Sequence, residues 1–535
     1  MLQVVTADEI RELDRKANED YGMPSATLME NAGWAVYKVI RRVLGGSVRG
    51  KKIAVFCGTG NNGGDGFVVA RLLKIQGANV FPFLVGDPTK IKGDAKVYYD
   101  LLTKMMPLPA FQEENHGESG LFQVIVDALL GTGISGAPRP EYTEAIRWIN
   151  LCAAEKNCKI ISVDIPSGMD ATTGEVPGGK SEGAVRADHT VTFAFPKWGL
   201  YLPPGDEYVG ELHLADIGMD WSLLSISPKA VLSEAQTFDF LQKRRQESNK
   251  GDYGHVYIIG GSAGMSGAPA MAARAAQRSG AGLVTVLAPA CVQLLIGAKL
   301  DEQMTIALPD EDGAVSEASF DKIVEATQRA TVLCLGPGMT TKPGVVALVQ
   351  RIIVEIDKPL ILDADALNAL AQNPEIALRR KENPHVPLIL TPHPGEAARL
   401  LGTDTVTIQS NRRQSVLQLA QKYRAIVVLK GRFTLIADPE GNLRINPTGN
   451  PGMATGGSGD TLTGILGGLF AQYEVKRSQA DDDNHSGSAL DWIAVGVWIH
   501  GRAGDIAAAH FGEASLVAGD ITTYLPRAMG ELSTE

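Results

Sequence analysis

Cysteine is scarce in this sequence, and the spacing of the few cysteines does not indicate pairs. Five occur among 535 residues, at Cys57, Cys152, Cys158, Cys291 and Cys334. The number is odd, and no two of them are separated by only two residues. We therefore expect neither a disulfide framework nor a zinc site, and the pattern favours a reducing, cytoplasmic location.

Long hydrophobic runs and an excess of basic residues are also missing. No stretch approaches the run of about 18 apolar residues that a membrane-spanning helix needs. The segment 1–20 is rich in charge and lacks the apolar core of a signal peptide. Lys and Arg number 50 against 61 Asp and Glu, so the net charge is -11. Membrane and nucleic-acid partners are therefore not expected, whereas nucleotides can still bind through backbone N–H groups.

The length and the glycine content indicate a multidomain enzyme. A chain of 535 residues exceeds one hydrophobic core. Its 59 glycines gather in short motifs rather than repeats, which is typical of ligand sites lined by backbone. We predict an α/β protein of two three-layer α/β/α domains, Rossmann-like at residues 1–222 and a second one at residues 223–535. The boundary lies in the polar segment 217–249, for which no strand is predicted.

Alternating strand and helix signals support both domains. Two helices are predicted over residues 4–47, the first capped by Thr6 with Glu9 completing a capping box. Strands then follow at 52–57, 80–85, 124–128, 160–163 and 189–193, with a glycine-rich turn at 58–66 and a helix at 67–76. In the second half, strands are predicted at 255–259, 283–287, 332–335, 360–362, 388–390 and 426–429. This alternation predicts parallel sheets with helices on both faces.

Two glycine-rich loops in the first half follow predicted strands. Residues 58–66 read Gly-Thr-Gly-Asn-Asn-Gly-Gly-Asp-Gly, and residues 131–136 read Gly-Thr-Gly-Ile-Ser-Gly. Loops at the carboxyl ends of strands let phosphates or dinucleotides approach the backbone. The spacing matches neither the dinucleotide fingerprint nor the P-loop, so a tight turn without a ligand remains an alternative.

Polar residues from three strands are predicted to meet at the same edge of the first sheet. Asn62 lies in the first glycine loop, Asp127 ends the strand at 124–126, and Asp164 follows the strand at 160–163, three residues before Ser167. A carboxylate at a strand end, beside backbone that binds anions, is a candidate general acid or base. Capping of a helix is the alternative role of either aspartate.

Together these motifs resemble the NAD(P)H-hydrate epimerase domain. The resemblance rests on residues 61–66, 127–133, 163–168 and 195–199 (Phe-Pro-Lys-Trp-Gly), and covers about residues 1–220. It implies that Asn62, Asp127 and Ser167 hold K⁺, a hard cation suited to their oxygens, and that Asp164 is the acid/base at C6 of the nicotinamide ring. The residues implied to bind the hydrated cofactor are Asn61, Asn62, Gly63, Gly64, Asp65, Gly131, Thr132, Gly133, Ile134, Ser135, Gly136, Ala137 and Asp164.

The strongest motif of the second half occupies residues 450–460, with the sequence Asn-Pro-Gly-Met-Ala-Thr-Gly-Gly-Ser-Gly-Asp, directly before a predicted helix at 461–470. Backbone N–H groups and the dipole at a helix start stabilise negative charge. Asp460 can take a proton from an attacking hydroxyl while these donors stabilise a phosphoryl group. The alternative is an aspartate that only stabilises the helix N-terminus.

This motif resembles the ribokinase-like fold, and further motifs narrow the resemblance to the NAD(P)H-hydrate dehydratases. These motifs lie at 250–255, 260–267, 336–338, 363–368, 391–396 and 430–431, in family order. The resemblance implies Asp460 as the catalytic residue. It implies substrate contacts by Gly338, Thr391, Pro392, His393, Pro394, Gly395, Glu396 and Asp460. The implied nucleotide contacts are Lys430, Gly431, Arg432, Phe433, Thr434, Gly449, Thr455, Gly456, Gly457, Ser458 and Gly459.

Three polar features each leave two interpretations. His393 can contact the substrate, as the resemblance favours, or only hydrogen-bond the backbone. Asp363 and Asp365 can be a metal pair or structural carboxylates at a strand end. The acidic segment 476–487 can bind a metal or be a solvated surface loop, and a block of like charges favours the loop.

The resemblance implies a bifunctional enzyme that repairs hydrated NAD(P)H. Phosphorylation of the C6 hydroxyl and loss of phosphate would restore the double bond of the S epimer, and the epimerase would supply that epimer from the R form. The implied co-substrate is ADP with Mg²⁺, and the choice of ADP over ATP comes from the resemblance alone. We also expect a homo-oligomer. The alternative function is a ribokinase-like vitamin or sugar kinase with a non-catalytic N-terminal ligand-binding domain.

Overall fold

A computed structural model of the chain describes residues 2–112, 122–134, 136–154, 158–179, 183–219, 230–235, 238, 244, 246–380, 386–479 and 487–532. The chain forms two compact units, Gln3–Ser227 and Pro228–Glu535, the second together with Met1–Leu2. The predicted boundary between residues 222 and 223 lies outside the described residues. So do Ser135 and the acidic part of the segment 476–487.

The first unit is built on a six-stranded parallel sheet. Its strands are β2 (Lys52–Cys57), β3 (Asn79–Leu84), β4 (Val124–Ala128), β5 (Lys159–Val163), β6 (His189–Phe193) and β7 (Glu211–Ala215). Their order is β3-β2-β4-β5-β6-β7. The chain adds β3 on one side of β2 and then adds β4 to β7 on the other side, so the switch point of the sheet lies between β2 and β4. In open α/β sheets a ligand crevice forms at such a switch point, beyond the carboxyl ends of the strands.

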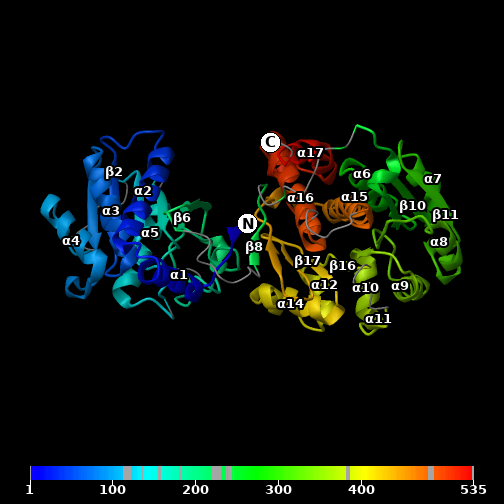
Figure 1. Ribbon diagram of the computed structural model, residues 1–535, viewed down its shortest axis with the longest axis horizontal. Coiled ribbons are helices and arrows are strands. Elements are labelled where there is room, and N and C mark those ends of the chain that lie inside the picture. The colour runs from blue at the N-terminus through cyan, green and yellow to red at the C-terminus, as the bar shows by residue number, and fades with distance from the viewer. Residues whose placement is uncertain are drawn as a thin grey trace. The chain divides into compact units, whose positions relative to one another are not determined.

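Alternating side chains of these strands divide the first unit into two hydrophobic cores. Ile53 and Val55 of β2 pack with α1 (Ala7–Glu19), α2 (Ser25–Val43), α3 (Asn61–Ile75) and α4 (Gly93–Met105). Ala54 and Phe56 point to the other face and pack with α5 (Pro140–Ala154). The helices thus cover both faces of the sheet, and the first unit is a three-layer α/β/α domain (Figure 1).

The second unit contains an eleven-stranded mixed sheet in the order β1-β8-β19-β18-β17-β16-β15-β14-β9-β10-β11. The strands are β1 (Leu2–Gln3), β8 (Ala230–Leu232), β9 (His255–Ile259), β10 (Leu283–Pro289), β11 (Met304–Leu308), β14 (Val332–Leu335), β15 (Leu360–Leu362), β16 (Leu388–Leu390), β17 (Ile426–Leu429), β18 (Leu435–Ala437) and β19 (Leu443–Ile445). A small hairpin, β12 (Asp310–Glu311) and β13 (Ala314–Val315), stands apart. The switch point lies between β9 and β14, and at such a point a ligand crevice is expected beyond the carboxyl ends of the parallel strands.

Helices cover both faces of this second sheet (Figure 1). One face packs against α6 (Gly267–Arg278), α7 (Ala290–Gly297), α15 (Ser458–Gln479), α16 (Ala489–Phe511) and α17 (Ala518–Gly530). The opposite side carries α9 (Pro343–Glu355), α10 (Ala364–Gln372), α12 (Pro394–Leu401) and α14 (Arg412–Tyr423). The remaining helices are α8 (Phe320–Ala326), α11 (Ile376–Arg379) and α13 (Thr405–Ser410). The predicted fold class, with two three-layer α/β/α domains, is therefore confirmed.

All of the predicted strands are confirmed, with ends that differ by at most two residues. The capping box of Thr6 and Glu9 at α1 is confirmed as well. The strands predicted in the second half pair in parallel with one another, as expected. The sheet also contains β18, which is not among the predicted strands and is antiparallel to both of its neighbours. The prediction of no strand in the segment 217–249 is wrong, because the three residues of β8 pair with β19 in parallel although they lie in an otherwise polar segment.

The helix predicted at 67–76 begins earlier than expected. It starts at Asn61, so most of the predicted glycine turn forms the first turns of α3. The glycines there permit close packing: a Cβ on Gly63 would lie 1.9 Å from the carbonyl oxygen of Gly58, and one on Gly66 would lie 2.6 Å from Cβ of Ala128. Glycine is therefore needed to bring this helix against the ends of β2 and β4, and not only to make a turn.

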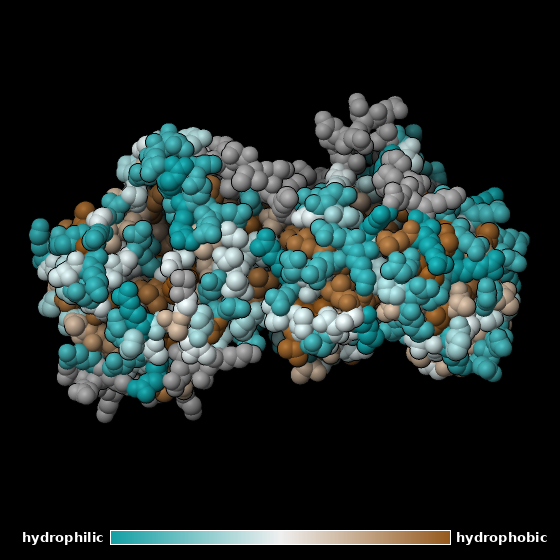
Figure 2. Space-filling view, turned by 90° about the horizontal axis from the view of Figure 1, so that it is seen from below, coloured by the Kyte–Doolittle hydropathy of each residue, from teal (hydrophilic) through white to brown (hydrophobic). Residues whose placement is uncertain are grey.

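The molecular surface is mostly hydrophilic on the face drawn in Figure 2, where hydrophobic residues form smaller separate areas. Among the described helices, none has the length and apolar character needed to cross a membrane. All five cysteines are free thiols, and only Cys291 is exposed.

Candidate active sites

The predicted polar cluster of the first unit is present at the carboxyl ends of β4 and β5. Asp127 is fully buried, and its carboxylate accepts hydrogen bonds from the Ser167 hydroxyl (2.5 Å), the Ser167 N–H (2.9 Å) and the Ser162 hydroxyl (2.8 Å). The Asn62 amide donates to the carbonyl of Leu130 (3.0 Å), which lies 3.2 Å from the Ser167 hydroxyl. The three predicted potassium ligands therefore converge on one point.

The carboxyl group of Asp127 has no cationic side chain among its described partners, all of which are neutral donors. Burial raises the pKa of Asp127, and the hydrogen bonds from Ser167 and Ser162 only partly offset this. A monovalent cation bound beside the carboxylate would supply the missing positive charge. Its ligands would be carboxylate, hydroxyl, amide and carbonyl oxygens, the donors that hard cations prefer.

Asp164 lies directly after β5 and forms an ion pair with a buried lysine. Lys197 Nζ is 2.5 Å from Asp164 Oδ1, and the lysine side chain is only 1% exposed. The Thr192 hydroxyl (3.2 Å) and the Phe193 N–H (3.3 Å) also donate to Oδ1. Since these donors, the ones found among the described residues, all reach Oδ1, the second carboxylate oxygen is the one available for proton transfer.

The backbone of Asp164 explains how its side chain reaches this position. Its φ is 65°, a left-handed conformation that aspartate tolerates better than most residues. This turn at the strand end directs the carboxylate across to β6, next to Lys197. Conformational strain of this kind is common at functional sites.

A second acidic residue, Asp65 on α3, lies near this ion pair. Burial raises its pKa well above the usual range, and the negative charges of Asp164 and Asp14 add to this effect, while Lys197 opposes it. Two carboxyl groups in different environments close to one lysine are an arrangement found in acid–base sites.

The two glycine loops of the first unit meet through their backbones. A Cβ on Gly58 would lie 1.9 Å from the carbonyl oxygen of Leu129, so the loop after β2 packs directly on the loop after β4. In contrast, nothing lies within 4 Å of the position of a Cβ on Gly60, Gly133 or Gly136. These glycines therefore border open space, where a ligand can approach the backbone.

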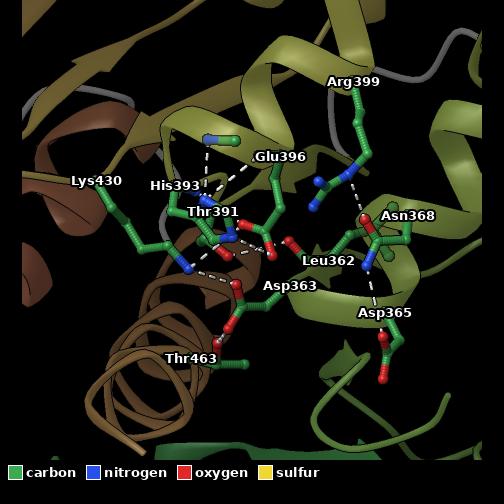
Figure 3. Close-up of polar contacts among 11 residues, drawn as sticks. Leu362, Asp363, Asp365, Asn368, Thr391, His393, Glu396, Arg399, Lys430 and Thr463 are labelled. Atoms are coloured by element: carbon green, nitrogen blue, oxygen red, sulfur yellow. Dashed lines mark hydrogen bonds and ion pairs between the residues drawn. The ribbon is translucent and has the colours of Figure 1, made fainter. Parts of the chain in front are cut away.

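In the second unit, a buried ion pair lies at the carboxyl ends of β15 and β17 (Figure 3). Lys430 Nζ is 2.8 Å from Asp363 Oδ1, and the Thr463 hydroxyl of α15 donates to Asp363 Oδ2 at 2.8 Å. Burial acts to raise the pKa of Asp363, but Lys430 outweighs it and holds this pKa below its usual range. Both carboxylate oxygens are engaged, which favours the structural interpretation of Asp363 over a metal pair with Asp365.

Asp365 likewise has a structural contact. Its Oδ2 accepts the N–H of Thr340 at 2.8 Å, in the loop that follows the Gly336-Pro337-Gly338 motif. The carbonyl of Gly338 accepts a hydrogen bond from the Ser262 hydroxyl. The loops after β9 and β14 are thus tied together at the switch point, which is where the predicted substrate contact Gly338 lies.

The predicted substrate residues His393 and Glu396 lie at the start of α12 (Figure 3). His393 Nδ1 accepts N–H groups from Gly395 (3.0 Å) and Glu396 (3.4 Å), so this ring nitrogen has the backbone-capping role considered above. The proton of the neutral ring is therefore on Nε2, and the side chain is 51% exposed. His393 can thus cap the helix and present Nε2–H to a ligand. Thr391 is buried and donates to the carbonyl of Leu362.

Glu396 is almost buried and lies 3.8 Å from Lys430. Burial raises the pKa of Glu396 to about 7; the positive charge of Lys430 opposes this effect, and the negative charge of Asp363 adds to it. Lys430 therefore lies between two acidic residues of which only Asp363 has a depressed pKa.

The glycine-rich motif forms the N-terminus of α15, which begins at Ser458 instead of the predicted 461. Gly457 has a φ of 93°, which favours glycine, and a Cβ on Gly456 would meet nothing within 4 Å. A Cβ on Gly459 would lie 3.5 Å from Lys430 Nζ and 3.7 Å from Asp363 Oδ2. The open N-terminus of this helix therefore faces the buried ion pair, and its N–H groups can bind an anion there.

Asp460 is the third residue of α15. Burial raises its pKa to about 6, the negative charge of Asp363 adds to this effect, and Lys430 opposes it. A carboxylate with a pKa near the working pH is a suitable general base. His500 supports the same loop, since its Nε2 is 3.0 Å from the carbonyl of Ser458.

The remaining predicted nucleotide residues form the loop after β17. Arg412 is buried and donates to the carbonyls of Leu429 (3.1 Å) and Lys430 (3.3 Å), which holds the start of this loop. The Thr434 hydroxyl donates to the carbonyl of Gly431. The guanidinium of Arg432 lies 5.1 Å from the ring of Phe433. Among the predicted nucleotide contacts, Lys430 and Gly459 lie next to each other, since a Cβ on Gly459 would be 3.5 Å from Lys430 Nζ.

Two residues of these sites are not predicted by the sequence. Lys197 belongs to the 195–199 motif with no predicted role, and Thr463 falls within the predicted helix at 461–470. Their partners are 33 and 100 residues away in the chain, so no local pattern connects them. The only signal for Lys197 was a lysine within an otherwise apolar and aromatic stretch.

Two family models match the chain. The model described as NAD(P)H-hydrate dehydratase matches residues 256–527, and the model described as YjeF-related protein N-terminus matches residues 25–199. The two matches fall in the two structural units.

Relatives match over the whole length. The chain is 40% identical to the bifunctional NAD(P)H-hydrate repair enzyme Nnr of Moorella thermoacetica, with 100% of this chain and 98% of the relative covered. It is 36% identical to the Escherichia coli enzyme of the same name, with 97% and 93% covered. A crystal structure of an ADP/ATP-dependent NAD(P)H-hydrate dehydratase from Bacillus subtilis with ATP and Mg²⁺ is 29% identical and covers 55% of this chain and 95% of its own, with a TM-score of 0.45. The chain belongs to the family of bifunctional NAD(P)H-hydrate repair enzymes.

Proposed function

We propose that the protein restores hydrated NAD(P)H in two steps, one in each unit. The first unit interconverts the R and S epimers at C6 of the nicotinamide ring, and the second dehydrates the S epimer with ADP as phosphate donor. The observation that carries this proposal is that each unit has a carboxylate beside glycine-rich loops at the carboxyl ends of the parallel strands of its sheet. The two carboxylates are Asp164 and Asp460.

In the second unit, Asp460 acts as the general base of a phosphoryl transfer. It takes the proton of the C6 hydroxyl while that oxygen bonds to the terminal phosphorus of the nucleotide and the bond to the leaving phosphate oxygen breaks. The N–H groups of residues 456–459 and the Lys430 ammonium stabilise the negative charge of the transferred group. Loss of phosphate from C6 and of a proton from the neighbouring carbon then restores the double bond.

In the first unit, Asp164 moves the proton at the C6 hydroxyl. As Asp164 takes the proton of the hydroxyl, the bond from C6 to the ring nitrogen breaks, its electron pair goes to the nitrogen, and C6 becomes an aldehyde carbon. Attack of the nitrogen on the other face of this aldehyde re-forms the bond, and the return of the proton to the oxygen gives the other epimer. Lys197 holds Asp164 Oδ1, and Asp65, whose pKa burial raises, lies near this pair. Asn61 and the open backbone at Gly133 and Gly136 are available for the rest of the cofactor.

The metal ions follow from the donors present. Asn62, Asp127 and Ser167 would hold K⁺, which would supply positive charge near the phosphates of the hydrated cofactor. Mg²⁺ would be held mainly by the nucleotide phosphates and water, because Asp363 is engaged with Lys430 and Thr463. A homo-oligomeric state and a cytoplasmic location remain predictions.

The direct test measures recovery of the near-ultraviolet absorbance of reduced nicotinamide. A mixture of both NADH hydrate epimers is given to the untagged protein with Mg²⁺ and either ADP or ATP. We expect complete recovery with ADP. Recovery that stops at the share of the S epimer would contradict the epimerase activity, and no recovery with either nucleotide would contradict the dehydratase.

The rate of dehydration should fall as the pH drops below about 6. The pKa of Asp460 is raised to about 6, so the base form that accepts the proton is lost as pH falls through this value. We expect kcat/KM for the purified S epimer to fall by about tenfold per pH unit on the acid side. The Glu396→Gln variant should keep this acid limb, since the pKa of Glu396 is about 7. A limb that disappears in this variant would assign the titration to Glu396 instead.

The kinase alternative is disfavoured because the named repair enzymes match both units, and the N-terminal match extends through the Asp164 motif. A vitamin or sugar kinase would not need the ion pair of Asp164 and Lys197. Phosphorylation of a vitamin or sugar without recovery of NADH would restore this alternative.

A further inference from the structure

A cluster of two histidines and one glutamate lies at the edge of the first sheet, apart from the residues discussed above. His189 begins β6, and Glu211 and His213 are on β7. Each offers a ligand atom within 4.8 Å of the others, and no other such group of three occurs among the residues that the structure describes. The two histidine side chains are 16% and 12% exposed, whereas Glu211 is 63% exposed.

The strand register explains why these side chains meet. β6 and β7 are parallel, with His189 opposite Glu211 and Val191 opposite His213. Residues two apart on a strand share a face, so Glu211 and His213 point to the same side as His189. The two imidazole rings are stacked, with their centroids 5.3 Å apart.

The ligand atoms of this cluster lie at distances close to those of a metal site. His189 Nδ1 is 3.2 Å from His213 Nε2, and the two carboxylate oxygens of Glu211 lie one against each ring, with Oε2 3.4 Å from His189 Nδ1 and Oε1 3.6 Å from His213 Nε2. In a tetrahedral zinc site with bonds of about 2.0–2.2 Å, the edges between ligand atoms are about 3.3–3.6 Å. One ligand atom from each residue lies within 4.8 Å of the other two, and Glu211 is exposed, so a small rotation of its carboxylate can bring a single oxygen to both nitrogens.

We propose that His189, Glu211 and His213 form a Zn²⁺ site that joins β6 to the edge strand β7. Two imidazoles and a carboxylate are frequent zinc ligands, and the fourth position is left for water. The prediction of no zinc site rests on the spacing of the cysteines, which take no part here.

Arg42 on α2 competes with the metal. Its Nη2 lies 2.8 Å from His213 Nδ1 and 3.8 Å from Glu211 Oε1. In this arrangement Arg42 donates to Nδ1, and the ring proton is on Nε2. Zinc binding requires the proton to move to Nδ1 and the guanidinium to move away. The Arg42 side chain is 63% exposed, so this displacement is readily made.

The site is remote from the epimerase chemistry. His189 begins β6, whereas Thr192 and Phe193, which contact Asp164, are at its other end. Four residues of strand correspond to roughly 13 Å. Zinc would therefore stabilise the edge of the sheet without touching Asp164. Binding and catalysis can be measured independently for this reason.

The test titrates the untagged full-length protein with Co²⁺ and Zn²⁺, without nucleotide. We expect one Co²⁺ per chain with the visible absorption of tetrahedral cobalt, its displacement by Zn²⁺, and a Tm that rises with Zn²⁺ concentration. Glu211→Gln, an exposed substitution, should weaken Zn²⁺ binding by at least tenfold, and His213→Ala should abolish it. Arg42→Gln should bind Zn²⁺ several-fold more tightly.

His510→Ala is the matched control, because it removes an exposed histidine outside the cluster. Its Zn²⁺ affinity should equal that of the unchanged protein. No tetrahedral cobalt spectrum, or equal Zn²⁺ affinity in Glu211→Gln and the unchanged protein, would overturn the proposal. Weaker binding by Arg42→Gln would overturn it as well, because it would make Arg42 a supporting residue and not a competitor.

Discussion

Replacing Asp460 by Asn is expected to lower the rate of dehydration of the S epimer by about 10²–10⁴-fold. The substitution keeps the shape of the side chain but removes the carboxylate that accepts the proton of the attacking hydroxyl. The N–H groups at the start of α15 and the ion pair of Lys430 and Asp363 remain in place. ADP affinity should therefore change by only a few-fold, and the loss should appear in kcat.

The chain offers a close control for this variant in Asp520. This aspartate is also the third residue of a helix, α17, and accepts the N–H of Val517 at its start. Asp520→Asn makes the same chemical change at the same helix position, in a helix other than α15. Its dehydration rate should equal that of the unchanged protein. A similar loss in both variants, or none in Asp460→Asn, would show that Asp460 only stabilises a helix.

Replacing Asp164 by Asn should lower epimer interconversion by about 10²–10⁴-fold while dehydration of the purified S epimer continues. Asparagine tolerates the left-handed backbone of this position, with its φ of 65°, so the fold should be retained. The variant loses the charge paired with Lys197 and the oxygen that accepts the proton. The measurement follows interconversion of separated R and S epimers by chromatography, corrected for the spontaneous reaction.

A second lysine–aspartate pair in the same unit provides the control. Lys159 Nζ is 2.7 Å from Asp188 Oδ1, at the amino end of β5. Asp188→Asn breaks an ion pair of similar length, away from the glycine loops, and should leave epimerisation unchanged. Lys197→Met should slow epimerisation and change its pH profile, because Lys197 acts by positioning Asp164. Normal epimerisation by Asp164→Asn would remove Asp164 as the acid/base.

The sequence predicts the parts of the fold that rest on local patterns. The strands that end at Cys57 and Leu335 are mainly apolar runs followed by glycine, and both are found where expected. The switch points depend on the order of the strands in each sheet, and the sequence of a single strand does not determine that order. The capping box at Thr6 is equally local, since its two residues are three positions apart.

What the sequence does not predict depends on pairing across the sheet or on packing. The start of α3 at Asn61 depends on how closely Gly63 and Gly66 approach β2 and β4. The strand β8 is recognisable only once β19 is beside it. His189 and His213 are 24 residues apart in the chain, and the register of two strands brings them together. Each of these features requires knowledge of a partner that is distant in the chain.

The separate cores of the two units have a consequence for the supply of substrate. Each unit closes its own hydrophobic layers around its own sheet, and each has its own candidate acid/base. Because both are made in one polypeptide, every ribosome that completes the chain produces the two activities in a one-to-one ratio. A cell cannot then accumulate the dehydratase without the partner activity that recycles the epimer it leaves behind, whatever the level of expression.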